Sequence, residues 1–316
     1  DARLKVEVTA GAALCPLHAS HPDRLLRRAE AALVRARREG ARLAFASDAL
    51  ADHDVGELWD LEFQLAGAIE RGELQMHFQP QVRAADLGFT GAEALMRWTS
   101  PTRGDVPPDV FIPIAERTGL IKKLTVWALN SALRQAAHWP VEGRRVTVAV
   151  NLPGMLATQE DLPDLVSDAL RLWAAPHVRL VLEITEGSLM DAGHAFDILE
   201  RIRALGVGIS IDDFGTGYSC LAYFKSIPAD EVKVDRTFVQ SLASDEDTAA
   251  LVRLIVELAH RFGLGVAAEG LEDAATLAAL RALGCDTVQG FLVGRPMPQD
   301  VFLDWLPAHR QAAVAP

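Results

Sequence analysis

Residues 207–218 read VGISIDDFGTGY, an apolar run that ends in two adjacent carboxylates. The run Val207–Ile211 has the length and the β-branched content of a buried strand, and Asp212 and Asp213 follow it directly. One such strand end alone does not distinguish a functional carboxylate from a turn former, so the inference depends on whether the arrangement recurs.

The same arrangement recurs along the chain, where short apolar runs close on polar or ionisable residues. Because the carboxyl ends of parallel strands meet at one face of a sheet or barrel, we expect these residues to share one site. Besides the pair at 212–213, the residues concerned are Glu93, Asn151, Glu183, Glu186, Lys233, Asp235, Glu269 and Gln289.

Strand and helix patterns alternate from about residue 58 onward. Only residues 83–88 join the first two predicted strands, which is too short for a helical crossover, so these two should be antiparallel. The rest of the pattern predicts a parallel α/β barrel. The predicted strands are Leu74–Val82, Phe89–Trp98, Arg145–Leu152, Val178–Thr185, Val207–Asp213, Glu231–Asp235, Leu264–Glu269 and Thr287–Val293. Helices are predicted at about 58–72, 108–138, 160–174, 191–205, 245–262, 273–283 and 299–309.

Residues 1–50 form a separate segment. A strand is predicted at Leu4–Val8, a helix at Pro22–Arg38 and a short closing strand at Leu43–Phe45. Such a β-α-β segment has too few strands to bury its own apolar face.

The composition excludes several classes of function. The 316 residues include 43 acidic and 31 basic side chains, a net charge of −12, which disfavours binding to DNA, RNA or anionic membranes. Cys15, Cys220 and Cys285 lie far apart and form no zinc or disulfide pattern. No signal peptide is evident and no apolar run approaches the ~20 residues of a membrane span. We therefore expect a cytoplasmic chain, which leaves open membrane attachment through segments outside it.

The strand-end residues favour a site for hard divalent cations. Glu93, Asn151, Glu183 and Asp212 offer three carboxylates and one amide oxygen, a donor set suited to Mg²⁺ or Mn²⁺. Asp213 could ligate a second ion, and two ions about 3.5–4 Å apart are the usual arrangement for attack on a phosphodiester. A cation and a further carboxylate, at positions 233 and 269, are expected on the opposite side of the barrel mouth.

Each of these residues also has a structural interpretation. An aspartate after a strand is most often a turn former or a helix cap, and Asn151 before Leu-Pro-Gly fits a turn equally well. Lys233 alone could be a solvated side chain, and Glu269 could mark a helix start. Glu93 differs, because it lies inside an apolar strand, where an unpaired carboxylate is costly. Their joint occurrence at successive strand ends favours a functional site.

The motifs resemble those of the EAL-domain family, the cyclic-di-GMP phosphodiesterases of bacterial signalling, over about residues 58–310. The signature itself reads EALMR at 93–97. The other matching stretches are Asn151, EITE at 183–186, DDFGTGYS at 212–219, KVD at 233–235, EGLE at 269–272, QGF at 289–291 and GRPMP at 294–298. The resemblance implies a modified TIM (β/α)8 barrel with an antiparallel first strand, spanning residues 58–316.

The resemblance also implies roles for individual residues. The first of two Mg²⁺ or Mn²⁺ ions would be held by Glu93, Asn151, Glu183 and Asp212, and the second by Asp212, Asp213 and Glu269. Glu269 would be the general base, Lys233 would orient the attacking water, and Glu186 would anchor the loop after Asp213. The substrate, cyclic di-GMP, would contact Arg97, Gln289, Leu95 and Asp235, and its product would be linear pGpG.

Two alternatives to hydrolysis remain open. A catalytically silent cyclic-di-GMP receptor would keep the pocket and lose metal ligands, whereas no ligand position is missing here. A barrel lyase or isomerase with one Mg²⁺ and a lysine base would not need Asp213. We also expect a homodimer. Residues 1–50 resemble the C-terminal end of a GGDEF-like domain, although the GGDEF signature itself is absent.

Overall fold

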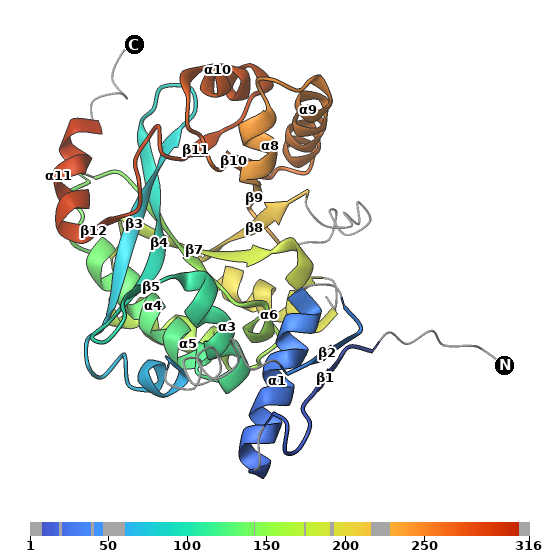
Figure 1. Cartoon of the computed structure of the whole chain (residues 1–316). Helices are drawn as coiled ribbons and strands as arrows, with labels where there is room; N and C mark the ends of the chain where they lie inside the picture. Colours follow the sequence, from blue (N-terminus) through green and yellow to red (C-terminus); the bar gives the residue numbers. More distant parts are fainter. Residues whose placement is uncertain are drawn as a thin grey trace. The chain divides into compact units, whose positions relative to one another are not determined.

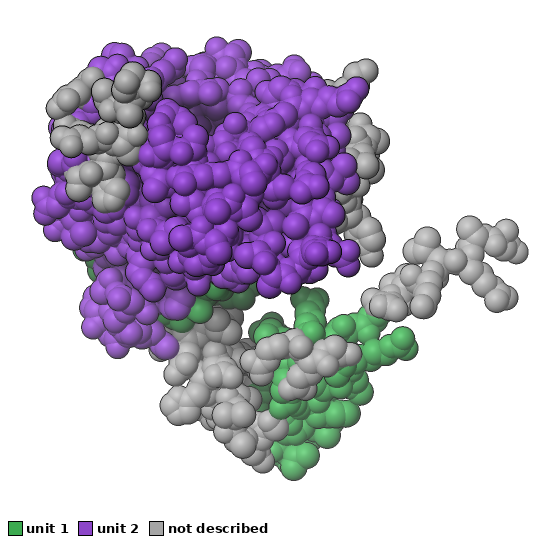
Figure 2. All heavy atoms as spheres, turned by 90° about the horizontal axis from the view of Figure 1, so that it is seen from above, with its two compact units in different colours: residues 1–71, 109–118 green, residues 72–108, 119–316 purple. Residues whose placement is uncertain are grey.

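The computed structural model describes residues 8–18, 21–38, 41–46, 61–141, 143–173, 175–189, 193–215 and 228–309. The chain divides into two compact units, which Figure 2 shows in different colours. The first comprises residues 1–71 and 109–118, and the second residues 72–108 and 119–316. Among the described residues, no helix is both long and apolar enough to cross a bilayer.

The second unit contains a closed barrel of eight strands (Figure 1). The strands follow one another around the barrel in the order β3-β11-β10-β9-β8-β7-β6-β4, and pairing of β3 with β4 closes it. β3 is antiparallel to both of its barrel neighbours and all other pairs within the barrel are parallel, which confirms the predicted fold class. The barrel strands are β3 (Leu74–Arg83), β4 (Phe89–Ser100), β6 (Val146–Asn151), β7 (Val178–Thr185), β8 (Gly208–Phe214), β9 (Glu231–Val234), β10 (Gly265–Ala268) and β11 (Thr287–Gln289). Two short strands, β5 (Gly104–Val106) and β12 (Met297–Pro298), extend the sheet.

Helices follow the parallel strands, mostly where the sequence pattern predicts them, although the short helices at 154–156, 186–189 and 236–241 were not predicted. In the second unit these are α4 (Ile121–Ala136), η1 (Gly154–Leu156), α5 (Leu162–Leu172), η2 (Glu186–Leu189), α6 (Gly193–Ala204), α8 (Arg236–Ser241), α9 (Glu246–Arg261), α10 (Ala274–Leu283) and α11 (Gln299–His309).

Two predicted boundaries are wrong. The helix expected at 108–138 is two helices, α3 (Pro108–Thr118) and α4, because Gly119 between them adopts a left-handed backbone conformation with φ of 75°. The strand expected to run to Val293 ends at Gln289, since the Val293 amide donates to the Gly290 carbonyl in a turn.

The barrel strands alternate between two environments. Residues such as Ile209, Val232 and Val288 are buried to 1% exposure or less, on the strand face opposite their polar neighbours. The other face, which carries Ser210 and Lys233, points into the barrel together with the strand-end residues. The barrel interior therefore combines polar side chains with small ones such as Ala149 and Ala267, which pair with Glu93 and Lys233, and the larger apolar residues named above lie on the opposite face.

The first unit contains β1 (Ala10–Ala12), α1 (Pro22–Arg38) and β2 (Leu43–Phe45), with the two strands parallel. A Cβ at Gly11 would lie 2.0 Å from the carbonyl oxygen of Ala29, so only glycine lets α1 pack this closely on β1. Residues 61–66 are helical, and the remainder of the helix expected to start at residue 58 falls partly outside the described residues. The strand predicted at Leu4–Val8 also lies outside them, apart from Val8.

Candidate active site

The strand-end residues lie at the carboxyl ends of neighbouring barrel strands. Asn151 and Gln289 end β6 and β11, Glu269 follows β10 directly, and Lys233 is the penultimate residue of β9. Glu93, Glu183 and Asp212 lie within β4, β7 and β8, and each reaches the same group of side chains through contacts described below. One face of the barrel therefore gathers residues that are up to 196 positions apart in the sequence.

Four carboxylates surround the ammonium group of Lys233. Its Nζ atom lies 2.9 Å from Glu183 Oε2, 3.4 Å from Asp212 Oδ1 and 3.7 Å from Glu93 Oε2, and it also contacts Glu269 Oε1. We call these carboxylates, from Glu93, Glu183, Asp212 and Glu269, the acidic cluster. Lys233 and Glu269 were expected on the opposite side of the barrel mouth from the other carboxylates. Both instead lie in one group with them, because β9 and β10 follow β8 around the barrel and the Lys233 side chain, 1% exposed, points inward.

Two amide side chains hold the carboxylate of Glu93. Asn151 Nδ2 donates to Glu93 Oε1 at 2.8 Å, and Gln289 Nε2 donates to Glu93 Oε2 at 2.6 Å. The Asn151 residue is exposed. Because its amide nitrogen donates the hydrogen bond to Glu93, its amide oxygen can still accept a bond or ligate a cation. Each oxygen of the carboxylate that interrupts the apolar strand therefore accepts a hydrogen bond, which offsets the cost of burying its charge.

The surroundings shift the pKa values of the carboxyl groups in the acidic cluster in different directions. Burial raises the pKa of Glu183 well above its usual value, and the nearby carboxylate of Glu93 raises it further. Burial also raises the pKa of Glu93, but Lys233 and the two amide donors outweigh this effect and leave it below its usual value. Burial, opposed by Lys233, raises the pKa of Glu269 to about 7. The pKa of Lys233 is raised well above normal because four carboxylates outweigh the effect of burial, so Lys233 stays protonated.

Asp212 and Asp213 point to different partners although they are adjacent. Asp213 has φ of 55°, the left-handed region, so the strand alternation breaks at this residue. Asp212 faces Lys233, and its Oδ1 also accepts a hydrogen bond from the Asp213 amide at 3.0 Å. Burial raises the pKa of Asp213, and so do the neighbouring carboxyls of Asp212 and Asp235. Both aspartates are therefore available at the barrel mouth, which a regular strand would not allow.

The remaining predicted residues lie next to this group. Leu95 and Arg97 occupy the same face of β4 as Glu93, and half-buried Arg97 donates to the Met96 carbonyl at 2.8 Å. Asp235 is the N-cap of α8, where its Oδ1 accepts from the backbone amide two residues later.

Glu186 begins η2 just beyond β7. Its Oε2 accepts a hydrogen bond from the Gly215 amide at 3.1 Å, two residues after Asp213. The rest of the loop that Glu186 was expected to anchor, residues 216–227, lies outside the described residues.

The acidic cluster fits divalent cations by its charge and its donor atoms. Four carboxylates against one ammonium leave three negative charges in excess if all are ionised, and every available donor is an oxygen. Within the described ranges, no three acidic, histidine or cysteine side chains converge as they stand on one point at ligand distance. The fit therefore rests on chemistry and not on a preformed coordination geometry.

Sequence reasoning missed two residues that contact this group, Gln79 and Gln81 of β3. Gln289 donates to Gln79 Oε1 at 3.0 Å and accepts from Gln81 Nε2 at 2.9 Å, and all three side chains are less than one-tenth exposed. No local signal distinguished them, because polar and apolar residues alternate along residues 74–82 (LQMHFQPQV) as they would in a strand with one solvated face.

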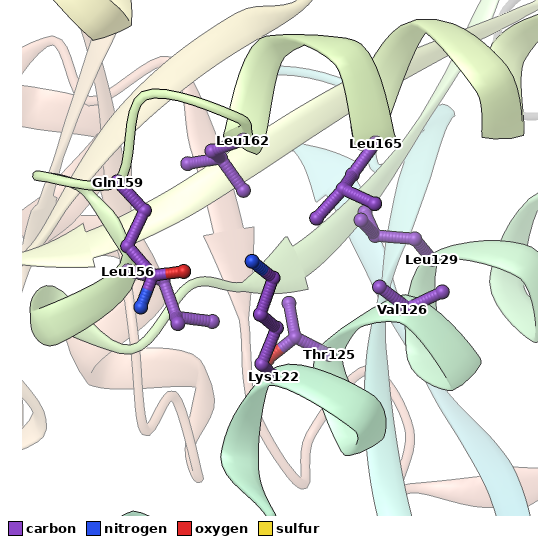
Figure 3. A pocket seen from close by; sticks show the side chains of 8 residues that line it. All are labelled: Lys122, Thr125, Val126, Leu129, Leu156, Gln159, Leu162 and Leu165. Atoms are coloured by element: carbon purple, nitrogen blue, oxygen red, sulfur yellow. The ribbon is translucent and has the colours of Figure 1, made fainter. Parts of the chain in front are cut away.

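A shallow surface depression lies between α4, η1 and α5 (Figure 3), and none of the strand-end residues lines it. Its walls are mostly apolar, with Lys122 forming an ion pair with Asp161. The lining residues are Lys122, Thr125, Val126, Leu129, Leu156, Gln159, Leu162 and Leu165.

Most of the chain matches known proteins. The family model described as EAL domain matches residues 63–296. The bifunctional diguanylate cyclase/cyclic di-GMP phosphodiesterase MucR of Pseudomonas aeruginosa is 40% identical over 302 residues, which cover 95% of this chain and 44% of MucR. The cyclic di-GMP phosphodiesterase NbdA of the same organism is 37% identical, with 99% of this chain and 40% of NbdA covered. The chain thus spans less than half the length of these curated relatives.

Solved structures agree with the fold. The structure described as PaMucR phosphodiesterase in complex with c-di-GMP aligns with a TM-score of 0.72 and 44% identity, covering 77% of this chain and 99% of that one. The EAL enzyme Bd1971 in its cAMP-bound form aligns with a TM-score of 0.73 and 33% identity, covering 79% of this chain and 70% of that one.

Proposed function

The chain belongs to the EAL domain family, and on that basis we propose that its barrel hydrolyses cyclic di-GMP to linear pGpG with divalent cations. The observation that carries the proposal is the acidic cluster around Lys233 at the carboxyl ends of the barrel strands. A relative of 40% identity is named for this activity, and a solved relative of 44% identity is described as a complex with c-di-GMP.

We assign the metal ligands to the residues of the barrel mouth. Glu93, Asn151, Glu183 and Asp212 would hold one Mg²⁺ or Mn²⁺ ion, and Asp212, Asp213 and Glu269 a second. Such ions, when bound, supply positive charge that polarises a phosphodiester and promotes ionisation of water. The four carboxyl groups of the acidic cluster, which outnumber its one ammonium group, support this assignment.

Two side chains of the chain itself are suited to proton transfer and positioning. Glu269 has a pKa of about 7 in the metal-free protein, so it can accept a proton from water at neutral pH. Lys233 stays protonated and can donate a hydrogen bond to a water molecule or to a phosphate oxygen, but it cannot act as a base. We therefore assign the general base to Glu269 and the orientation of water to Lys233.

The substrate contacts follow from the position of β4. Arg97 lies on the strand face that carries Glu93 and bears a guanidinium suited to a phosphate group. Leu95 lies between them on that face, and we assign it a contact with the substrate. We assign further substrate contacts to Asp235 and Gln289, which adjoin the acidic cluster, and propose that the active form is a homodimer.

We further propose that residues 1–50 are the C-terminal end of a GGDEF-like domain. The match to MucR covers 95% of this chain and so includes most of the residues that precede the EAL match at 63. Leu26, Val34 and Leu43 are each at least half exposed in this unit, apolar surface that two strands and one helix leave uncovered.

The test is turnover of cyclic di-GMP by the purified chain with Mg²⁺ or Mn²⁺, followed by chromatography and mass spectrometry of the product. We expect a linear dinucleotide heavier than the substrate by one water. Glu183→Gln should abolish turnover, and Asp168→Asn, at an exposed carboxylate on α5, should leave it unchanged.

Binding without turnover would instead support the receptor alternative. If neither turnover nor binding of cyclic di-GMP is detected, the proposal is wrong.

A further inference from the structure

Three buried glutamines form a connected row beside Glu93. Gln81 Nε2 donates to Gln289 Oε1 at 2.9 Å, and Gln289 Nε2 donates to Gln79 Oε1 at 3.0 Å and to Glu93 Oε2 at 2.6 Å. Gln79 Nε2 donates in turn to the carbonyl oxygen of Gly294 at 3.1 Å. Each of the four side chains is less than one-tenth exposed, so water contributes little to these bonds.

The ends of this row determine the direction of every amide in it. An ionised carboxylate and a backbone carbonyl can only accept hydrogen bonds, so Gln289 must present its nitrogen to Glu93, and Gln79 must present its nitrogen to Gly294. Both hydrogens of Gln289 Nε2 are then in use, and its oxygen faces Gln81. If the Gln289 amide turned by 180°, it would place oxygen against oxygen at Glu93 and nitrogen against nitrogen at Gln81.

The antiparallel strand brings these side chains together. Gln81 lies directly opposite Gln289 in the pairing of β3 with β11, and Gln79 lies opposite Glu93 in the pairing of β3 with β4. Directly opposed residues place their Cβ atoms about 4.5–5.5 Å apart on one face of a sheet, within reach of a glutamine amide. β3 thus supplies the barrel interior with the two polar side chains that complete the row.

We propose that Gln81 is a positioning residue for the active site. It supplies the hydrogen bond that satisfies the oxygen of the Gln289 amide in this orientation, and Gln289 in turn holds the Glu93 carboxylate in place. Without the Gln81 donor, Gln289 Oε1 would be buried without a partner, and rotation of the amide to find one would withdraw Nε2 from Glu93. This inference rests on the proposed function, which assigns Glu93 to the first metal ion.

Metal affinity measured without substrate tests this role. Methionine matches glutamine in length and volume but lacks the donor, so Gln81→Met should bind Mn²⁺ about tenfold more weakly by calorimetry, the lower end of the loss expected for an outer-shell partner. Gln81→Leu removes the same donor with a different shape and should lose a similar factor. Gln135→Met, on α4 outside the row, is the matched control and should bind as the parent does. Thermal unfolding in EDTA selects the variants that are folded.

The double variant separates positioning from packing. If Gln81 acts through Gln289, adding Gln81→Met to Gln289→Met should weaken Mn²⁺ binding no further. Parent-like affinity in folded Gln81→Met and Gln81→Leu would overturn the inference while the proposed function stands, provided that the parent hydrolyses cyclic di-GMP. If adding Gln81→Met weakens Mn²⁺ binding by the same factor in Gln289→Met as in the parent, the inference is also overturned. If the parent itself binds no Mn²⁺, the metal-dependent function and this inference both fail.

Discussion

Replacing Glu269 by glutamine should remove a large part of the pH dependence of folding stability in the metal-free protein. The pKa of Glu269 lies at about 7 in the folded chain, against an ordinary value of 4.5, because burial and the carboxylates of Glu93 and Asp212 outweigh the opposing effect of Lys233. A group whose pKa is higher in the folded state binds more protons there. Its contribution to stability is therefore complete below pH 4.5 and is lost as the pH rises through 7.

The expected magnitude follows from the same two values. Each pH unit between 4.5 and 7 is worth about 1.4 kcal/mol, which amounts to roughly 3 kcal/mol in all. Because part of this loss occurs below pH 5, a comparison of pH 5 with pH 8 should capture about 2.5 kcal/mol. The side chain is 21% exposed, so solvent screening leaves most of this figure in place.

The assay is urea unfolding in EDTA at pH 5 and pH 8, for the parent and for Glu269→Gln. Glutamine does not titrate, so the fall in the free energy of unfolding over this range should be about 2.5 kcal/mol smaller in the variant. Saturating Mg²⁺ should shrink the difference between the two proteins, because a cation bound at the acidic cluster favours ionised Glu269. Equal pH slopes for the parent and the variant in EDTA would refute the reasoning.

Three further predictions address the loop anchor, a close approach of backbones and the choice of metal. Glu186→Ala should fold but need roughly tenfold more Mn²⁺ for activity, because the Gly215 amide loses its acceptor two residues after Asp213; superimposable Mn²⁺ titrations would remove Glu186 from the site. Gly290→Ala should lower the free energy of unfolding by about 3 kcal/mol, because its Cβ would lie 2.1 Å from the Leu271 carbonyl oxygen, while Gly187→Ala, which meets nothing within 4 Å, should change it little; similar urea midpoints would contradict this. Ca²⁺ should bind but support much slower hydrolysis than Mg²⁺, because its longer and looser coordination positions water poorly; comparable product formation with the two ions would argue against the mechanism.

The fold was largely predictable because two local features of the sequence both indicate the architecture that the structure shows. Alternation of strands and helices indicated a barrel, and the short connection at 83–88 indicated that its first strand runs the other way. The break at Gly119 was not predicted, since the helical periodicity on its two sides is similar and only the backbone conformation separates α3 from α4. The final strand was predicted too long for a related reason: the turn at 290–293 is mostly apolar, so its sequence resembles a continued strand.

The convergence of the strand-end side chains was predictable from the sequence, and their arrangement was less so. Glu183 and Asp212 were indicated by the ends of apolar runs, because parallel strands must bring their ends together. Glu93 was indicated by its place inside an apolar strand, where an unpaired carboxylate is costly. Which side chain lies among the others depends on barrel closure, and no local pattern shows that Lys233 lies between the carboxylates. Gln79 escaped notice because glutamine is common on surfaces, and only the pairing of β3 shows that it lies inside.

The reversed first strand also changes where the chain enters the barrel. In a barrel with every strand parallel, the polypeptide enters at the floor, remote from the functional ends. Here β3 runs downward from the rim, so Glu73 and Leu74 lie beyond the level of Gln289, next to Trp98 at the far end of β4. A displacement of the chain just before Leu74 therefore acts on β3 at the end of the barrel where the carboxyl ends of the parallel strands lie. Along β3 it reaches Gln79 and then Gln81 before it reaches the opposite end of the barrel.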